Sequence, residues 1–349
     1  MLRSNTALAT NSRDKIYGVL ALSRDVYKLI PAPNYKLSTE IIYAIVTEAI
    51  VTAYSDLEVI CLGRFLLRSG LPSWVPDFGQ ELPLTMTADN AGDDLYDATG
   101  YIHSTDHVRA RHVGGFEADG LVLKARGFTF DVINGLGAVE LSFKRPTQIS
   151  EYIDYRLVQP DQIESPYSSE IGIFKALWTS LVLGRREYRA EPSDFLHSLY
   201  VITQASNSTR LAENFTEALS LWFSNNMSFE IHGLTLDTWF RRSTADPTRR
   251  DRNLEELTSR ELKFLKDITL STISKRLLFT RRGYIGMAPH EARKGDEVVL
   301  LLGSRVPVVL RKREEGGFEL VGEVYVHGIM NGEIMTQENS ERLEDFHIH

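Results

Sequence analysis

Residues 297–326 decide the fold, and they read EVVLLLGSRVPVVLRKREEGGFELVGEVYV. The stretch contains three apolar runs separated by two turn sequences: 297–302, Gly303-Ser304-Arg305, 307–313, Gly316-Gly317 and 318–326. Short apolar runs at a spacing of about 8 to 12 residues, bounded by glycine-containing turns, are typical of antiparallel strands. This stretch therefore predicts a small antiparallel β-barrel or meander.

A second strand region lies much earlier in the chain. Residues 120–130 read GLVLKARGFTF, in which apolar residues alternate with polar or small ones around Gly127. Such alternation is typical of two short strands or of one bent strand. We expect strands near 120–133 to join those of 297–326.

Helical patterns surround and separate these strands. Within 150–280, apolar residues recur three and four apart from 174 to 182, and the apolar residues from 254 to 279 predict one or two further helices. Near the N-terminus, a broad apolar stripe over 41–53 follows Ser38, which predicts a helix that packs against another part of the protein.

These patterns predict an α+β protein with a helical N-terminal part, a small antiparallel β-barrel or meander, and a helical insertion between its strands. The charged C-terminal end carries no apolar period and is expected to be loose. The expected parts are a helical segment with a packed Pro/Trp loop (1–84), a flexible loop (85–114), strands joining the C-terminal sheet (115–140), a helical insertion (150–280), a small β-barrel (281–335) and a loose tail (336–349).

Composition limits the partners and the compartment. The 349 residues include 39 Lys and Arg against 47 Asp and Glu, a net charge of −8, which argues against nucleic acid as a partner. The longest aliphatic run, 298–302, is far shorter than the roughly 20 apolar residues that cross a bilayer, so we expect no membrane span. A single cysteine, Cys61, and no apolar signal segment within 1–11 favour a cytoplasmic location.

Polar residues near the predicted barrel are the candidates for chemistry. His327 and Glu333 bracket an Asn331-Gly332 pair, so a base and an acid could meet around a tight turn. The same pair is also a favoured turn sequence, which leaves a structural interpretation open. Asp296 and Tyr284 complete this candidate site, although Asp296 is expected to hydrogen-bond the backbone of its own turn.

A possible metal site lies elsewhere in the chain. His103 and His107 are four apart, with Asp106 between them, and on a helix such a pair could bind a divalent metal. Turn-forming residues and glycines surround the pair, so we expect a solvated loop and no metal. The sequence also lacks a phosphate-binding glycine loop, a Gly-x-Ser-x-Gly elbow, a His-Glu-x-x-His motif and a paired CxxC. We expect no cofactor and, on balance, no enzyme.

Four separated strings, in their order and spacing, resemble one family, the fungal heterokaryon-incompatibility proteins. The strings are Arg-Asp-Lys-Ile-Tyr at 13–17 with Leu20 and Leu22, Leu-Pro-Ser-Trp-Val-Pro-Asp at 71–77, Gly-Tyr-Ile-Gly at 283–286 with Pro289, Gly295 and Asp296, and Gly-Glu-Val-Tyr-Val-His-Gly-Ile-Met-Asn-Gly-Glu at 322–333. The resemblance covers nearly the whole chain but corresponds to the region that follows the HET domain in typical members. The motifs of the HET domain itself have no counterpart in these residues.

The resemblance implies a role in non-self recognition between fungal cells, in which the HET domain triggers regulated cell death. It implies no catalytic residue in the region present here. We therefore expect a non-enzymatic interaction or regulatory module with protein partners and without the HET trigger. Two alternatives stay open: an enzyme or small-ligand-binding protein with a site assembled near His327, and a truncated gene product without an independent function.

Overall fold

The computed structural model of the chain has the α+β fold class that the sequence predicts. The chain divides into two compact units, of which the first contains Met1–Phe130, Val298–Glu323 and Ile329–His349 and the second contains Asp131–Glu297 and Val324–Gly328. The structure describes residues 9–20, 32–62, 70–79, 86, 95–100, 114–117, 121–139, 156–185, 188, 198–200, 202–203, 214–242 and 257–349.

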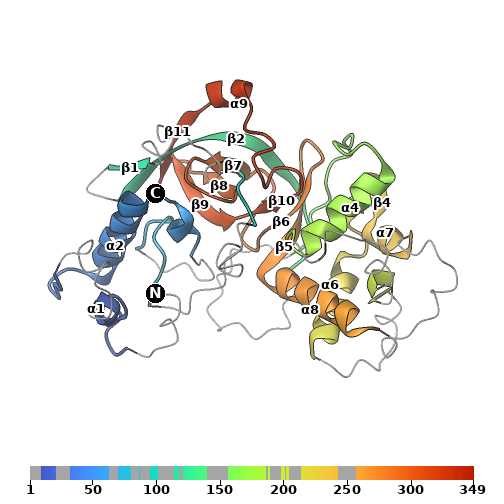
Figure 1. Cartoon of the computed structure of the whole chain (residues 1–349), viewed down its shortest axis with the longest axis horizontal. Helices are drawn as coiled ribbons and strands as arrows, with labels where there is room; N and C mark the ends of the chain where they lie inside the picture. Colours follow the sequence, from blue (N-terminus) through green and yellow to red (C-terminus); the bar gives the residue numbers. More distant parts are fainter. Residues whose placement is uncertain are drawn as a thin grey trace. The chain divides into compact units, whose positions relative to one another are not determined.

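The first unit is built on a ring of strands (Figure 1). The strands are β1 (Gly114–Glu117), the first part of β2 (Val122–Leu136), β7 (Glu297–Leu301), β8 (Val308–Lys312), β9 (Phe318–Glu323) and β11 (Glu344–Ile348). The order β2-β11-β9-β8-β7 closes on itself because β7 also pairs with β2, while β1 pairs with β2 outside this order. Strand β11 runs antiparallel to β2 and parallel to β9, so the sheet is mixed. The prediction that strands near 120–133 and 297–326 share a sheet is confirmed.

Gly127 allows β2 and β7 to approach closely. A Cβ atom at this position would lie 2.1 Å from the carbonyl oxygen of Leu300, a distance that no side chain tolerates. Because only glycine lacks that atom, closure of the ring requires glycine here. The glycine within the 120–130 run thus lies inside one continuous strand, rather than between two short ones.

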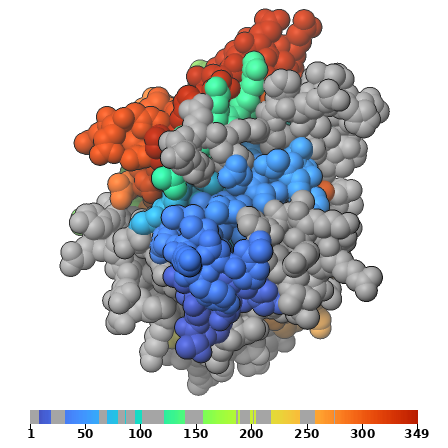
Figure 2. All heavy atoms as spheres, turned by 90° about the vertical axis from the view of Figure 1, so that its left-hand side faces the viewer, coloured from blue at the N-terminus to red at the C-terminus, as the bar shows by residue number. Residues whose placement is uncertain are grey.

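Helices α1 (Asp14–Leu20) and α2 (Thr39–Tyr54) and the short 3-10 helix η3 (Glu58–Cys61) belong to the same unit, and Figure 2 shows the two α-helices as one continuous surface. The Ser38 hydroxyl caps α2 by accepting a hydrogen bond from the N–H of Ile41. The buried side of α2 and η3, including Cys61, joins the inner side chains of the ring in one hydrophobic core.

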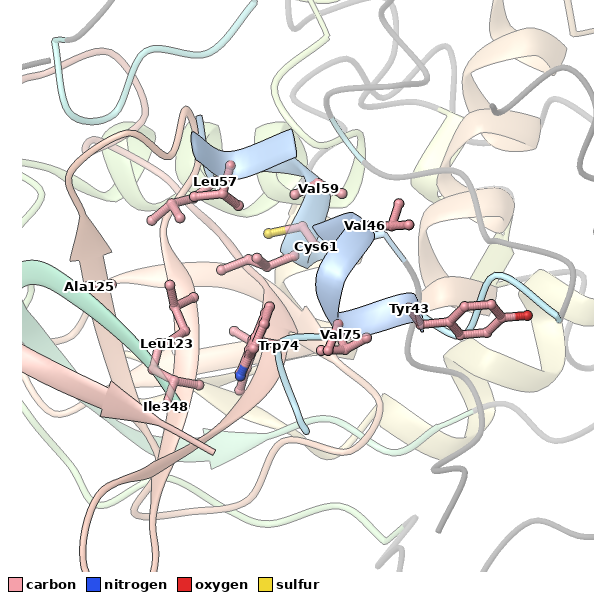
Figure 3. Close-up of a cluster of buried hydrophobic side chains, with 14 of the residues drawn as sticks. Tyr43, Val46, Leu57, Val59, Cys61, Trp74, Val75, Leu123, Ala125 and Ile348 are labelled. Atoms are coloured by element: carbon pink, nitrogen blue, oxygen red, sulfur yellow. The ribbon is translucent and has the colours of Figure 1, made fainter. Parts of the chain in front are cut away.

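The Pro/Trp segment at 71–78 is a packed part of this core. Trp74 is fully buried, and its indole N–H donates to the carbonyl of Leu121 at 3.3 Å. In Figure 3 the Trp74 ring lies beside Leu123 and Ile348 of the ring of strands. The Ser73 hydroxyl accepts a hydrogen bond from the N–H of Leu320 at 2.8 Å. Side-chain packing and these bonds hold a segment whose prolines prevent regular structure.

The second unit combines a small antiparallel sheet with a group of helices. Its sheet has the order β10-β6-β5-β2, and its helices α4 and α8 pack against β6 and β5, respectively. The elements are α4 (Glu170–Leu181), α6 (Asn214–Asn226), β3 (Glu230–Ile231), β4 (Leu234–Thr235), α7 (Leu236–Arg242), α8 (Ser259–Ser274), β5 (Lys275–Thr280), β6 (Ile285–Pro289) and β10 (Tyr325–Val326). Helix α8 begins with a capping box, in which Thr258 and Glu261 satisfy each other's backbone N–H groups.

The expectation of a loose tail at 336–349 is wrong. Helix α9 (Gln337–Glu341) is followed by β11, whose Phe346 and Ile348 are buried in the core of the first unit. Only two apolar residues alternate with Glu, Asp and His here, so the charges concealed a period of two. One of those charges, Asp345, pairs with Lys124 on the neighbouring strand at 3.0 Å.

Three further boundaries differ from the prediction. The helix expected to continue to 279 ends at Ser274, and β5 follows it. All six residues of β5 are buried, and a short apolar run alone does not distinguish a buried strand from a helix. Within the loop expected at 85–114, residues 95–99 are buried, and Asp97 and Ala98 donate backbone hydrogen bonds to Met330 and Arg305. The barrel expected at 281–335 is divided, since β6 and β10 belong to the second unit.

Candidate functional site

Tyr167 of the second unit joins two segments that are far apart in the sequence. Its hydroxyl donates to the carbonyl of His327 at 3.3 Å and accepts from the N–H of Ile285 at 3.0 Å. Burial raises the pKa of this phenol above its ordinary value. The hydroxyl therefore stays protonated and neutral while it holds both main-chain groups.

Aromatic and imidazole rings surround Tyr167. Its ring centroid lies 6.1 Å from that of Tyr284, 5.9 Å from that of His327 and 6.2 Å from that of His232. The Tyr325 hydroxyl lies 3.5 Å from Nδ1 of His327. We call these five residues the Tyr167 cluster. The structure thus brings together Tyr284 and His327, two of the four candidates identified from the sequence.

Backbone pairing explains why these two candidates meet. In the β6–β10 pair, Tyr325 is opposite Met287 and Val326 is opposite Gly286. A Cβ atom on Gly286 would lie 2.0 Å from the carbonyl oxygen of Tyr325, so this close approach also requires glycine. The N–H of His327 extends the ladder by donating to Ile285 at 2.9 Å. The string at 283–286 and residues 325–327 of the string at 322–333 therefore meet in one strand pair.

The other two candidates are placed differently. The Asp296 carboxylate accepts a hydrogen bond from the N–H of Arg293 at 2.8 Å, within its own turn. Glu333 belongs to the first unit, where its carboxylate accepts bonds from the backbone and the side-chain amide of Asn331 at 2.7 and 3.1 Å. Each carboxylate fixes a local turn.

The candidate metal ligands His103 and His107 lie outside the residues that the structure describes. Among the described ranges, no group of three or more His, Cys, Asp or Glu side chains is arranged to hold a metal ion.

His232 was not singled out from the sequence, yet it occupies a distinctive position. It lies in the turn between β3 and β4 with φ of +47°, an uncommon conformation for a residue other than glycine. Its Nε2 is 2.9 Å from the carbonyl oxygen of Gly283, and its Nδ1 is 3.4 Å from that of Ile163. It also lines a cavity of about 350 Å³ in the second unit. Only the His-Gly pair at this turn could have indicated it.

An acidic pair lies in the first unit beside a guanidinium group. Nε of Arg305 is 2.8 Å from Oε1 of Glu58, and the Asp56 carboxylate accepts the N–H of Glu58 at 2.5 Å. Burial, followed by the charge of Asp56, raises the pKa of Glu58 to about 7, although Arg305 acts in the opposite direction.

This pair makes the stability of the first unit depend on pH. The pKa of Glu58 is raised on folding from 4.5, so the folded state binds more protons and stability should fall as pH rises from about 4.5 to 7. Glu58→Gln should flatten this dependence, leaving the smaller contribution of Asp56, whose pKa is also raised. Denaturation at pH 5 and pH 8, followed by hydrogen–deuterium exchange of the backbone amides of α2 and β8 in the first unit, tests this expectation. The exposed Glu341→Gln serves as the control, and an unchanged slope in Glu58→Gln would contradict it.

Comparisons with known proteins agree with the resemblance carried by the four strings. Residues 197–348 match the family described as the Het-6 beta-barrel domain. The chain is 23% identical over 376 residues to "Heterokaryon incompatibility protein 6, OR allele" of Neurospora crassa, an alignment that covers 97% of this chain and 51% of the relative. The chain thus spans about half the length of the curated relative it matches. No solved structure matches it. Of the helices that the structure describes, none has the length and apolar character needed to span a membrane.

Proposed function

We propose that this chain, a fungal protein related to the heterokaryon-incompatibility proteins, is a non-enzymatic interaction or regulatory module of non-self recognition. It acts through contacts with other proteins. A match to the Het-6 beta-barrel domain over 197–348 supports the relationship, and the hydrogen bonds of the Tyr167 cluster support the non-enzymatic role.

The two hydrogen bonds of the Tyr167 hydroxyl are the main support for this proposal. Both of its hydrogen bonds go to main-chain groups, the carbonyl of His327 and the N–H of Ile285. A hydroxyl held between two backbone groups fixes two chain segments and is a poor group for proton transfer. The strings that this chain shares with its family therefore serve to build a scaffold, on which the outer surface provides partner recognition.

The contacts of Asp296, Glu333 and His327 support a non-enzymatic role. General acid–base catalysis needs two groups that reach the same substrate with their exchangeable protons. Asp296 and Glu333 each accept hydrogen bonds from their own turns, and the Nδ1 of His327 faces the hydroxyl of Tyr325. These contacts favour a structural use of all three side chains.

His327 separates this proposal from the alternative of an enzyme or small-ligand-binding protein with a site nearby. Because the imidazole packs against Tyr167, His327→Ala should lower the free energy of unfolding by about 1–2 kcal/mol. His327→Gln keeps a polar side chain of similar length and should therefore lower the free energy of unfolding by a smaller amount. Thermal denaturation measures the stability of each variant. The survival of heterokaryons formed by strains that carry the variant measures heterokaryon incompatibility.

A structural role of His327 and a functional site at His327 predict different effects of His327→Ala on stability and on incompatibility. The structural role predicts that heterokaryon incompatibility weakens only in step with stability. A variant that melts like the unmodified protein but abolishes incompatibility would instead identify a functional site at His327.

A further inference from the structure

A cavity of about 350 Å³ lies within the second unit and has no part in the proposed scaffold role. One wall is the segment 160–164, another is formed by Glu230 and the turn between β3 and β4, and Phe279 of β5 also lines it. Its size falls within the range of about 300–1,000 Å³ that is usual for small-ligand sites.

Side-chain bonds to the backbone hold both walls in place. The Gln159 amide donates to the carbonyl of Ser228 at 2.6 Å and accepts the N–H of Glu230 at 2.9 Å, so it pairs with β3 as a strand would. Asn134, which is fully buried, donates to the carbonyl of Asp161 at 3.3 Å. The cavity is therefore already formed before any ligand enters.

His232 provides a third hydrogen bond that holds the walls of the cavity, and it adds no positive charge. Its Nε2–H donates to the carbonyl of Gly283 at 2.9 Å, which links the β3–β4 turn to the turn after β5. Burial lowers the pKa of the imidazole below its ordinary value, against the opposing effect of the two neighbouring carbonyls. The ring is accordingly neutral at pH 7.

Carboxylates give the cavity a negative charge. Asp161, Glu164 and Glu230 line it, and no Lys or Arg of the described residues does. Lys294 pairs with Asp161 at 3.1 Å, so three negative charges and one positive charge leave a formal charge of −2. Among the described residues, the side chains of Glu164 and Glu230 have no hydrogen-bonding or ionic partner.

We propose that this cavity binds a small organic cation, an ammonium or guanidinium group carried on a short apolar chain. Glu164 and Glu230 receive the cationic group through charge-assisted hydrogen bonds. Pro160, Ile163 and Phe279 contact the apolar part. The cation belongs either to a free amine or to a lysine or arginine side chain of another protein, and both present the same chemistry.

Two probes distinguish these sources. Butylamine stands for a free amine and an acetylated, amidated Gly-Lys-Gly peptide, whose side chain carries the same ammonium group, for a protein side chain, with butanol as an uncharged comparison. Each is titrated into the full chain by calorimetry, and the ring proton resonances of His232 report whether binding occurs at this cavity. Tighter binding of butylamine would identify a free amine, and tighter binding of the peptide would identify a basic side chain of a partner.

The double variant Glu164→Gln, Glu230→Gln should weaken binding of the preferred probe by about ten-fold or more, because charged hydrogen bonds are lost. The control Glu341→Gln, exposed on α9 of the first unit, should leave the affinity unchanged. Absence of saturable binding by both cationic probes would overturn the proposal, as would equal binding of butanol or an unchanged affinity in the double variant. None of these results depends on whether the chain acts in incompatibility.

Discussion

Arg276→Ala should lower the free energy of unfolding of the second unit by roughly 3–5 kcal/mol, because a buried guanidinium that joins several segments is lost. Arg276 is 1% exposed. Its Nε donates to the carbonyl of Gly137 at 2.8 Å and its Nη2 to that of Arg156 at 2.7 Å. Its Nη1 lies 3.4 and 3.3 Å from the carbonyls of His290 and Ala292. Removal of the guanidinium group leaves these four carbonyl oxygens without its hydrogen bonds in the protein interior.

Chemical denaturation followed by tryptophan fluorescence measures this effect, since Trp178, Trp222 and Trp239 all belong to the second unit. Arg276→Lys should recover only part of the loss, because one ammonium group cannot reach four separate carbonyls. The exposed Arg281→Ala is the matched control and should change stability by less than about 0.5 kcal/mol. A loss below about 1 kcal/mol in Arg276→Ala would show that these bonds do not hold the unit together.

Asp267→Ala should be the second most damaging change, with a loss of about 3 kcal/mol. The Asp267 carboxylate, 8% exposed, pairs with Arg185 at 2.8 Å and accepts a hydrogen bond from the Tyr188 hydroxyl. Lys263, one turn earlier on α8, lies 3.6 Å away. The substitution leaves a largely buried guanidinium without this partner.

The exposed pair of Asp237 and Arg241 on α7, with N–O distance 2.8 Å, provides the comparison. Asp237→Ala should reduce stability by no more than about 1 kcal/mol, because solvent screens the pair. Equal losses in the two variants, measured by the same denaturation, would refute the assignment of Asp267 as a buried anchor.

Local patterns predicted much of the fold. The turns at Gly303 and Gly316-Gly317 divide the strands of 297–326 as expected, and the apolar stripe over 41–53 lies within α2. Strand β11 was not predicted, because only Phe346 and Ile348 show its apolar alternation. Its pairing with β2 and β9 stabilises it in the folded chain. Strand β5 escaped because burial on both faces removes the alternation that identifies a strand.

The candidate site was predicted less completely. Tyr284 and His327 were identified from the strings that contain them, and backbone pairing of β6 with β10 brings them together. Tyr167 and His232 were not, because their positions depend on hydrogen bonds to segments more than 50 residues away. No periodicity or motif encodes such contacts, which arise only when the chain folds.

The central claim is that this chain acts through protein contacts, and partner capture tests it most directly. The purified chain would be analysed for self-association by light scattering and then immobilised to bind proteins from lysates of compatible and incompatible fungal strains. We predict self-association or the saturable capture of a defined protein, at a level that His327→Gln retains. A folded chain that neither self-associates nor binds any protein would contradict the claim.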